Sequence, residues 1–200
     1  IRDSEKIGLR IQEHVLELAL AALRDRGNEM PSLSVNFTSA QLAGPKSAVR
    51  VLSRLAYYGI RPASLCVEVT EGVMLDRAAD TIFATLQTLH NAGVRIALDD
   101  FGTGYASLVH LRDMPVDSIK IDCSFIAGIE EKGGGTSAIV RAIVGLGRGL
   151  GKIVIAEGIE NEAQARWLTE LGCHLGQGYL YGRPAAAPLP RPAEKLDAEL

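Results

Sequence analysis

Six short apolar runs, each closed by a polar residue, constrain the fold of this chain more than any other feature of its sequence. The run at 94–98 is typical, because its β-branched and leucine residues lead directly into Asp99 and Asp100. A segment with helical periodicity follows each of the first five runs before the next run begins. This alternation predicts a β/α repeat and a parallel sheet, in which the polar strand ends meet at one edge. The runs end at Asn36, at Glu68 with Glu71, at Asp99 with Asp100, at Lys120 with Asp122, at Glu157 and at Gln177.

The acidic residues at these strand ends predict a cluster of negative charge. Two carboxylates about 4 Å apart repel each other by roughly 4 kcal/mol at an effective dielectric constant near 20. A divalent cation is the usual compensation, and oxygen ligands favour Mg²⁺ or Mn²⁺ over Zn²⁺. A helix cap or a hydrated polar rim is the alternative for any single residue, but it does not explain six successive strand ends. The four histidines, which show no metal-ligand spacing, are His14, His90, His110 and His174.

The composition favours one globular domain. A chain of 200 residues with 47% hydrophobic content can bury a substantial core. Its net charge of −3 argues against binding to a nucleic-acid polymer, which requires a basic surface. We expect the domain to occupy 1–187, followed by a tail at 188–200 that begins after a stretch rich in proline and alanine.

The cysteines and the apolar segments favour a cytoplasmic location. Cys66, Cys123 and Cys173 are odd in number and lack metal spacing, so we expect reduced core thiols inside or beside the strands. The most apolar region, 138–156, is interrupted by arginine and glycine residues, and we expect no membrane span and no signal peptide. If the domain is the cytoplasmic part of a larger, membrane-anchored protein, the anchor lies outside this sequence.

The hydrophobic patterns place the individual elements. The first helix is expected at 9–26, with an apolar face formed by Ile11, Val15, Leu18 and Ala22. Asn161 followed by Gln164 predicts a capping box at the start of the last helix. The expected strands are 33–37, 64–69, 94–99, 118–122, 152–157 and 173–177.

The number of repeats bears on the type of α/β fold. Six β/α units are two fewer than a closed (β/α)₈ barrel needs. An open doubly wound sheet can use six strands, but it binds ligands at one switch point beside a glycine-rich first turn, which this sequence lacks. Polar residues at all six strand ends therefore favour a TIM-like (β/α)₈ barrel whose first two strands are missing from this chain.

Six segments, in this order and spacing, resemble the EAL-domain family. The most specific is D-D-F-G-T-G-Y at 99–105, and the resemblance extends from about Ile1 to Pro184. It implies a modified TIM barrel that hydrolyses the bacterial second messenger cyclic di-GMP to the linear dinucleotide pGpG. The implied cofactor is Mg²⁺ or Mn²⁺ at a two-metal site, with Ca²⁺ as an inhibitor. The other five segments are 35–38, 68–71, 120–122, 156–160 and 177–179.

The resemblance also implies roles for individual residues. Asn36, Glu68 and Asp99 would bind the first metal ion and Asp100 the second, while Glu157 would hold the metals or their water molecules. Lys120 would neutralise charge near the attacking water, and together with Glu157 and Asp100 it forms the expected catalytic group. A salt bridge between Lys120 and Asp122 or another acid of the rim is the alternative. The expected ligand contacts are Gln177, Glu160, Asp122, Gly102 and Thr103, and Glu71 would steady the loop that carries the two aspartates.

The chain departs from the family at its start. The E-A-L motif and the arginine that follows it belong to a strand upstream of Ile1, so one metal ligand and one ligand-binding arginine are absent from this sequence. We expect a phosphodiesterase, with a catalytically inactive cyclic di-GMP receptor as the alternative. A third interpretation is an interaction scaffold that exposes sheet edges. The resemblance further implies a homodimer and sensory or GGDEF domains outside this sequence.

Overall fold

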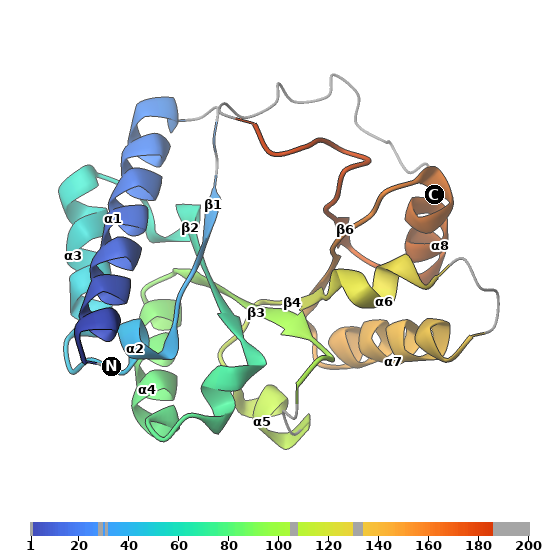
Figure 1. Cartoon of the computed structure of the whole chain (residues 1–200), viewed down its shortest axis with the longest axis horizontal. Coiled ribbons are helices and arrows are strands. Elements are labelled where there is room, and N and C mark those ends of the chain that lie inside the picture. The colour runs from blue at the N-terminus through green and yellow to red at the C-terminus, as the bar shows by residue number, and fades with distance from the viewer. Residues whose placement is uncertain (1, 28–29, 31, 105–107, 130–133, 186–200) are drawn as a thin grey trace.

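One parallel sheet organises the chain. The computed structural model describes residues 2–27, 30, 32–104, 108–129 and 134–185. Its six strands lie in the order β1-β2-β3-β4-β5-β6, so each strand pairs with the next one along the chain. Figure 1 shows these strands in an arc with helices around its outside. The strands are β1 (Leu33–Asn36), β2 (Leu65–Thr70), β3 (Arg95–Phe101), β4 (Ser118–Ile121), β5 (Ile153–Ala156) and β6 (Leu175–Gly176).

The helices after the first one connect consecutive strands, and the first one precedes β1. None of the helices in the described part of the chain is both long and apolar enough to span a membrane. Tyr105, the last residue of the D-D-F-G-T-G-Y segment, and the expected tail at 188–200 lie outside the described residues. The helical elements are α1 (Arg2–Arg26), α2 (Ser39–Leu42), α3 (Ser47–Tyr58), η2 (Pro62–Ser64), η3 (Glu71–Leu75), α4 (Ala79–Asn91), α5 (Leu108–Asp113), α6 (Cys123–Ala127), α7 (Gly135–Gly149) and α8 (Glu162–Leu171).

The strand order distinguishes between the two α/β folds that the sequence left open. A doubly wound sheet reverses its strand order at a switch point. Here the order runs without reversal from β1 to β6, and these two strands form the edges of the sheet. The sheet is therefore the six-stranded part of a (β/α) barrel, as predicted from the repeat count.

The strand residues divide between two faces of the sheet. Because side chains alternate along a strand, residues of one parity face the helices and those of the other parity face the inside of the arc. Val67, Leu98 and Ile119 belong to the buried apolar core, whereas Glu68 and Lys120 lie at the alternate positions. Because both faces of the sheet are covered by other parts of the chain, the strand sequences are nearly continuous apolar runs.

The packing of α1 corrects the prediction for its apolar face. Leu16, Leu20 and Leu23 are buried, while Ile11 and Leu18 are 59% and 58% exposed. The helix carries apolar residues on two opposite faces. The face with Leu16, Leu20 and Leu23 is the one that contacts α2, α3 and β1. Periodicity identifies apolar faces but does not tell which of two will be covered.

The described part of α1 begins at Arg2, seven residues before the expected start at 9, whereas the other element boundaries follow the sequence more closely. The expected capping box is present at α8, where the Asn161 side chain accepts a hydrogen bond from the Gln164 backbone N–H at 3.0 Å. β6 is shorter than expected, with two residues in place of 173–177. β4 ends at Ile121, and Asp122 becomes the N-cap of α6.

Candidate metal centre

The carboxyl ends of four neighbouring strands bring the predicted polar residues together. Glu68 lies in β2, Asp99 and Asp100 in β3 and Lys120 in β4, and Glu157 follows directly after β5. The parallel register aligns these strands so that their ends lie at the same level of the sheet. Residues separated by as much as 89 positions in the sequence thus share one site.

Lys120 lies at the centre of this group. Its Nζ atom is 2.9 Å from a carboxylate oxygen of Glu68, 2.9 Å from one of Asp99 and 2.7 Å from one of Glu157. An ammonium group has three N–H donors, and these three carboxylates can accept all of them. The alternative prediction of a salt bridge is therefore realised with rim acids other than Asp122. We call the four acids Glu68, Asp99, Asp100 and Glu157 the carboxylate cluster; Lys120 is its central cation.

The charges of the carboxylate cluster are strongly coupled. Burial by itself would lower the pKa of Lys120, but the hydrogen bonds that its ammonium group donates to Glu157, Glu68 and Asp99 outweigh burial and raise this pKa above its ordinary value. The lysine is therefore a cation at neutral pH. Four carboxylates around one ammonium leave an excess of three negative charges, so the site can accept further positive charge.

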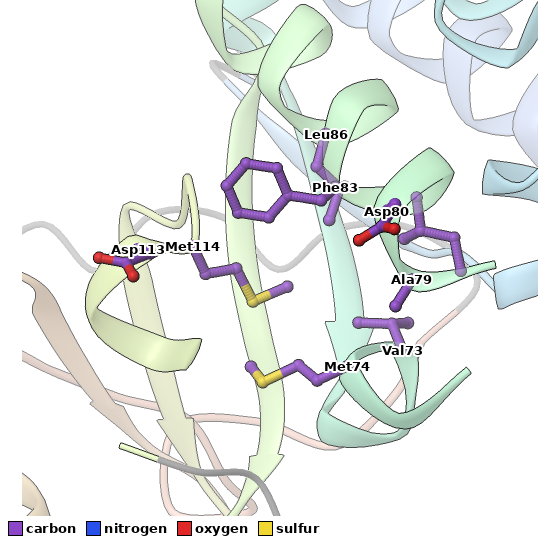
Figure 2. A pocket seen from close by; sticks show the side chains of 9 residues that line it. Val73, Met74, Ala79, Asp80, Phe83, Leu86, Asp113 and Met114 are labelled. Carbon is purple, nitrogen blue, oxygen red and sulfur yellow. The ribbon is translucent and has the colours of Figure 1, made fainter. Parts of the chain in front are cut away.

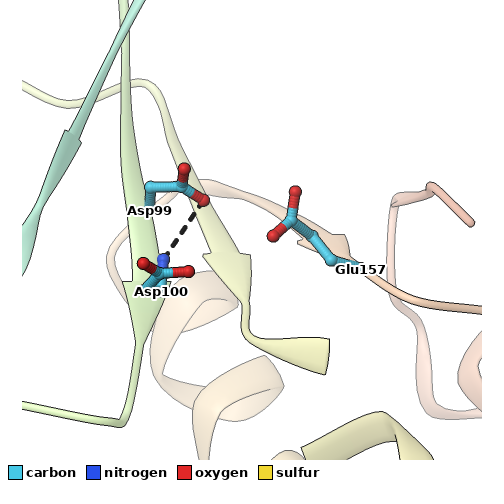
Figure 3. Close-up of side chains that lie close together, drawn as sticks. All are labelled: Asp99, Asp100 and Glu157. Carbon is cyan, nitrogen blue, oxygen red and sulfur yellow. Dashed lines mark hydrogen bonds between the residues drawn. The ribbon is translucent and has the colours of Figure 1, made fainter. Parts of the chain in front are cut away.

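Three of the acids lie close enough together to share a metal ion. One ligand atom each from Asp99, Asp100 and Glu157 lies within 4.8 Å of the others. Figure 3 shows the Asp99 and Glu157 carboxylates facing each other, with Asp100 beside them. Partial burial and the neighbouring charges of Asp99 and Asp122 raise the pKa of Asp100, and burial raises the pKa of Glu157 against the opposing effect of Lys120. A divalent cation bound to these oxygens would relieve this repulsion, and an all-oxygen donor set fits Mg²⁺ or Mn²⁺.

A backbone irregularity allows the two adjacent aspartates to serve one site. Side chains of consecutive strand residues normally point to opposite faces. The β3–β4 register shifts between Leu98 and Phe101, and Asp100 has a φ angle of 54°, the only positive φ among the described residues other than glycine. The Asp100 backbone N–H also donates a hydrogen bond to Asp99 Oδ1 at 3.1 Å, drawn as the dashed line in Figure 3. Bulges of this kind often re-aim side chains beside active sites.

Glu71 holds the loop that follows the two aspartates. Its carboxylate, in the buried residue at the start of η3, accepts a hydrogen bond from the Gly102 backbone N–H at 2.6 Å. The loop lies so close that a Cβ atom on Gly104 would stand 2.5 Å from a Glu71 oxygen. The Thr103 hydroxyl donates to the Asp100 carbonyl at 2.8 Å. These contacts are consistent with the expected steadying role of Glu71.

The remaining predicted residues surround the cluster without joining it. No hydrogen bond or ion pair between described residues links the side chains of Asn36, Glu160 or Gln177 to the carboxylate cluster. Asn36 pairs in register with Glu68 at the end of β1. The Ala156 carbonyl accepts the Gln177 N–H at 2.8 Å, which places Gln177 beside the Glu157 loop. All three residues are exposed and can meet a ligand from solvent.

Asp122 has a structural partner in the described structure. It accepts hydrogen bonds from the backbone N–H and the hydroxyl of Ser124 at the start of α6. The Ser124 hydroxyl is the main reason that the pKa of Asp122 lies below its ordinary value. Gly102 and Thr103 are exposed on the loop after β3. The expected contacts of these residues with a ligand therefore stay predictions.

The cysteine prediction needs one correction. Cys66 and Cys173 are partly buried, but Cys123 is exposed at the first residue of α6. Its Cβ lies against Gly158, where an added Cβ would meet it at 2.5 Å. Burial, Asp122 and Glu157 raise the pKa of the Cys123 thiol, so it stays protonated at neutral pH. The position directly after a strand end suggested burial, whereas the short α6 helix turns the residue outward.

Two features escaped the sequence prediction. The left-handed backbone of Asp100 was not predicted, because aspartate is enriched at positive φ but most aspartates do not adopt it. The Arg183 guanidinium lies 4.4 Å from the centroid of the Tyr179 ring, which is 53% exposed. The G-R-P sequence at 182–184 contains this arginine, but nothing in its spacing indicates that it stacks on the tyrosine.

A separate cavity lies on the outer side of the sheet. It measures about 170 Å³ and is bordered by η3, the start of α4 and the residues at the end of α5. Figure 2 shows its mostly apolar lining, with Met74, Phe83 and Met114 around the opening and Asp80 and Asp113 among the lining side chains. No member of the carboxylate cluster lines it, so this cavity is distinct from the candidate metal centre.

Comparison with known proteins identifies relatives over nearly the whole chain. The model of the EAL domain family matches residues 2–184. MucR of Pseudomonas aeruginosa, described as a bifunctional diguanylate cyclase/cyclic di-GMP phosphodiesterase, is 40% identical over 202 residues, which cover 98% of this chain and 28% of MucR. Other curated relatives are also much longer, since the aligned part is only 19% of two of them.

Solved structures agree with this comparison. The MucR phosphodiesterase in complex with cyclic di-GMP has a TM-score of 0.83 at 40% identity, covering 90% of this chain and 80% of that chain. BlrP1 of Klebsiella pneumoniae, solved with cyclic di-GMP and either manganese or calcium, has a TM-score of 0.79 at 31% identity, covering 88% of this chain and 44% of that chain.

Proposed function

This chain belongs to the EAL domain family, and on that basis we propose that it hydrolyses cyclic di-GMP to linear pGpG with Mg²⁺ or Mn²⁺ bound at the carboxylate cluster. The observation that supports this most directly is the convergence of Asp99, Asp100 and Glu157 within 4.8 Å of one another. A phosphodiester is an anion and would be repelled by this site without bound cations. The same cations make the site suitable for phosphoryl chemistry.

The proposed metal ligands divide between two positions. Asn36, Glu68 and Asp99 would hold one ion, and Asp100 with Glu157 would hold the second. Bound divalent cations would supply a Lewis acid for the attacking water and for the leaving oxygen of an in-line displacement. Ca²⁺ would occupy the same oxygen ligands with longer bonds and a looser geometry, which is the proposed basis of its inhibition.

The protein residues have their own tasks. Lys120 stays protonated and would balance negative charge beside the attacked phosphorus. Glu157 would help to hold the metal ions or the attacking water and would orient that water for the displacement. Glu71 would keep Asp100 in place by holding the backbone of Gly102.

The exposed and partly exposed residues around the cluster are proposed to bind the nucleotide. Gln177, Glu160 and Asp122 offer amide and carboxylate oxygens that can accept hydrogen bonds from the N–H groups of guanine. Gly102 and Thr103 offer a close backbone approach and a hydroxyl at the loop after β3. We further propose a homodimer, a cytoplasmic location, and sensory or GGDEF domains in the rest of the polypeptide, since MucR carries two activities.

Hydrolysis by the 200-residue chain tests the proposal. Cyclic di-GMP is incubated with the protein in Mg²⁺ or Mn²⁺, and pGpG is separated by chromatography. We expect turnover that Glu157→Gln reduces by at least about a hundredfold. Glu162→Gln, which alters an exposed glutamate at the start of α8, is the matched control and should leave the rate unchanged. Binding of cyclic di-GMP without any turnover would refute hydrolysis and favour a receptor.

A further inference from the structure

Lys120 forms ion pairs with acids that could also bind a metal ion. Its ammonium group makes ion pairs of 2.7–2.9 Å with Glu68, Asp99 and Glu157, and all four side chains are at most 18% exposed. Two of these three carboxylates, Asp99 and Glu157, also belong to the group of acids that could hold a metal ion together with Asp100. The ammonium and a metal ion would therefore compete for the same two residues.

The ammonium group is well placed to act in place of a metal ion. It is a compact cation with three donors, and three carboxylates converge on it from three different strands or strand ends. A divalent cation bound to Asp99, Asp100 and Glu157 would add two positive charges next to the first. The metal ion and the ammonium would repel each other and draw on oxygens of the same two carboxylates, so metal binding weakens the ion pairs of Lys120 with Asp99 and Glu157.

We propose that Lys120 is an internal counter-ion that occupies the carboxylate cluster in the metal-free chain and is exchanged for metal on loading. The inference deepens the proposed function, because it assumes that the carboxylate cluster is where metal binds. On exchange, Lys120 leaves Asp99 and Glu157 and keeps its ion pair with Glu68, which is not one of the three acids whose ligand atoms lie within 4.8 Å of one another. Glu68 can serve both cations, since a carboxylate has two oxygens.

The exchange has two physical effects. In the metal-free chain, the ammonium prevents buried carboxylates from repelling one another, so the site keeps its shape without metal. On loading, the metal must replace two existing ion pairs, so its affinity is lower than the same carboxylates would give alone. Lys120 therefore lowers the affinity of the site for metal and keeps the carboxylates in place when no metal is bound.

Metal binding without nucleotide tests this inference. The dissociation constant of Mn²⁺ is measured on the full chain from the electron paramagnetic resonance signal of free Mn²⁺, and the melting temperature is measured with and without Mn²⁺. We expect Lys120→Met to bind Mn²⁺ at least about tenfold more tightly than the unchanged chain. Its metal-free melting temperature should fall by on the order of 10 °C, because three buried carboxylates lose their partner.

Lys152→Met is the matched control. Lys152 is a partly buried lysine just before β5 whose Nζ donates to the Val116 carbonyl at 2.6 Å, so the substitution removes a lysine contact at the opposite end of the sheet. Its Mn²⁺ affinity should be unchanged. An equal or weaker Mn²⁺ affinity of Lys120→Met, or no Mn²⁺ binding by either protein, overturns the exchange.

A second measurement on the unchanged chain covers the case in which Lys120→Met does not fold. The lysine ammonium resonances are followed by ¹H–¹⁵N spectroscopy during a Mg²⁺ titration, with Lys120 assigned by its absence in Lys120→Arg. The Lys120 resonance should shift on loading, and an unchanged resonance at saturating Mg²⁺ overturns the inference. Neither readout uses cyclic di-GMP, so metal exchange without hydrolysis would refute only the proposed function. Hydrolysis with an unshifted Lys120 would refute only the exchange.

Discussion

The backbone geometry of Asp100 brings its carboxylate close to those of Asp99 and Glu157. A left-handed backbone at an aspartate costs on the order of 1–3 kcal/mol, and it persists only where neighbouring contacts enforce it. Here those contacts come from Glu71 through Gly102 and from the Thr103 hydroxyl. The D-D-F-G-T-G-Y segment indicated which residues matter, but it did not indicate the bulge, because the register shift depends on pairing with β4.

Removing the Glu71 carboxylate tests this support. We expect Glu71→Ala to lower both Mn²⁺ affinity and turnover by about 10–100-fold, the usual effect of losing a residue that orients metal ligands. The domain should remain folded, because Gly102 is exposed and water can accept its N–H. Circular dichroism, Mn²⁺ binding and the rate of pGpG formation measure the three effects.

Glu71→Gln separates the hydrogen bond to the Gly102 N–H from the negative charge of the Glu71 carboxylate. Glu71→Gln keeps an oxygen that can accept the Gly102 N–H, so it should retain most of the metal affinity. If Glu71→Ala showed a normal rate, Glu71 would have no steadying role.

The raised pKa of Asp100 predicts a pH effect of definite sign. A carboxyl group whose folded-state pKa lies above its unfolded value destabilises the folded chain once pH rises above that raised pKa. In the metal-free protein, Asp100→Asn should therefore raise the melting temperature at neutral pH, and the gain should disappear as pH falls through the window just above the ordinary aspartate pKa of about 4. Asparagine tolerates the left-handed backbone, so the loop should be preserved.

Metal reverses the sign of this effect. A bound cation needs the ionised Asp100, so Asp100→Asn should weaken Mn²⁺ binding at neutral pH. Melting temperatures of both proteins between pH 4 and 8, with and without Mn²⁺, measure the two effects. A variant that is less stable than the unchanged chain without metal at neutral pH would show that Asp100 is not under repulsion.

Helices and strands could be predicted where the residues that determine them are close together in the sequence. The cap of α8 follows from Asn161 and Gln164 alone, and the strand ends follow from single apolar runs. The length of β6 was not predictable, since it depends on how much of 173–177 pairs with β5, and only Leu175 and Gly176 do so. The covered face of α1 likewise depends on its neighbours and not on its own pattern.

The α8 cap predicts a measurable contribution to stability. Asn161→Ala removes the acceptor for the Gln164 N–H and should lower the free energy of unfolding by about 1 kcal/mol. Asn161→Asp keeps an acceptor and should stay close to the unchanged chain. Urea denaturation followed by fluorescence of Trp167, which lies in α8, reports the difference. Equal losses in both variants would mean that the cap hydrogen bond does not stabilise the helix.

In the part of the chain that the structure describes, the sheet is an open arc and α1 carries an uncovered apolar stripe. Ile7, Ile11, Val15 and Leu18 are 47–59% exposed, and their spacing places them on a single face of α1. The edge strand β1 lies beside this helix, with one side unpaired in the described sheet. The repeat count predicted the open sheet, but it did not reveal the stripe, because periodicity alone does not tell which of two apolar faces of a helix its neighbours cover.

An exposed stripe beside a free strand edge favours self-association of this 200-residue chain. We expect its weight-average mass in analytical ultracentrifugation to rise with concentration, and Ile11→Lys with Leu18→Lys to suppress the rise. Neither residue is buried, so the double variant should keep its melting temperature. Tyr57→Lys, at an aromatic residue on α3 that is 83% exposed and contacts Tyr58 edge-on, is the matched control and should still associate. A chain that stays monomeric at all concentrations and unfolds cooperatively would contradict this prediction. It would show that exposure of the stripe and the strand edge to water does not drive association.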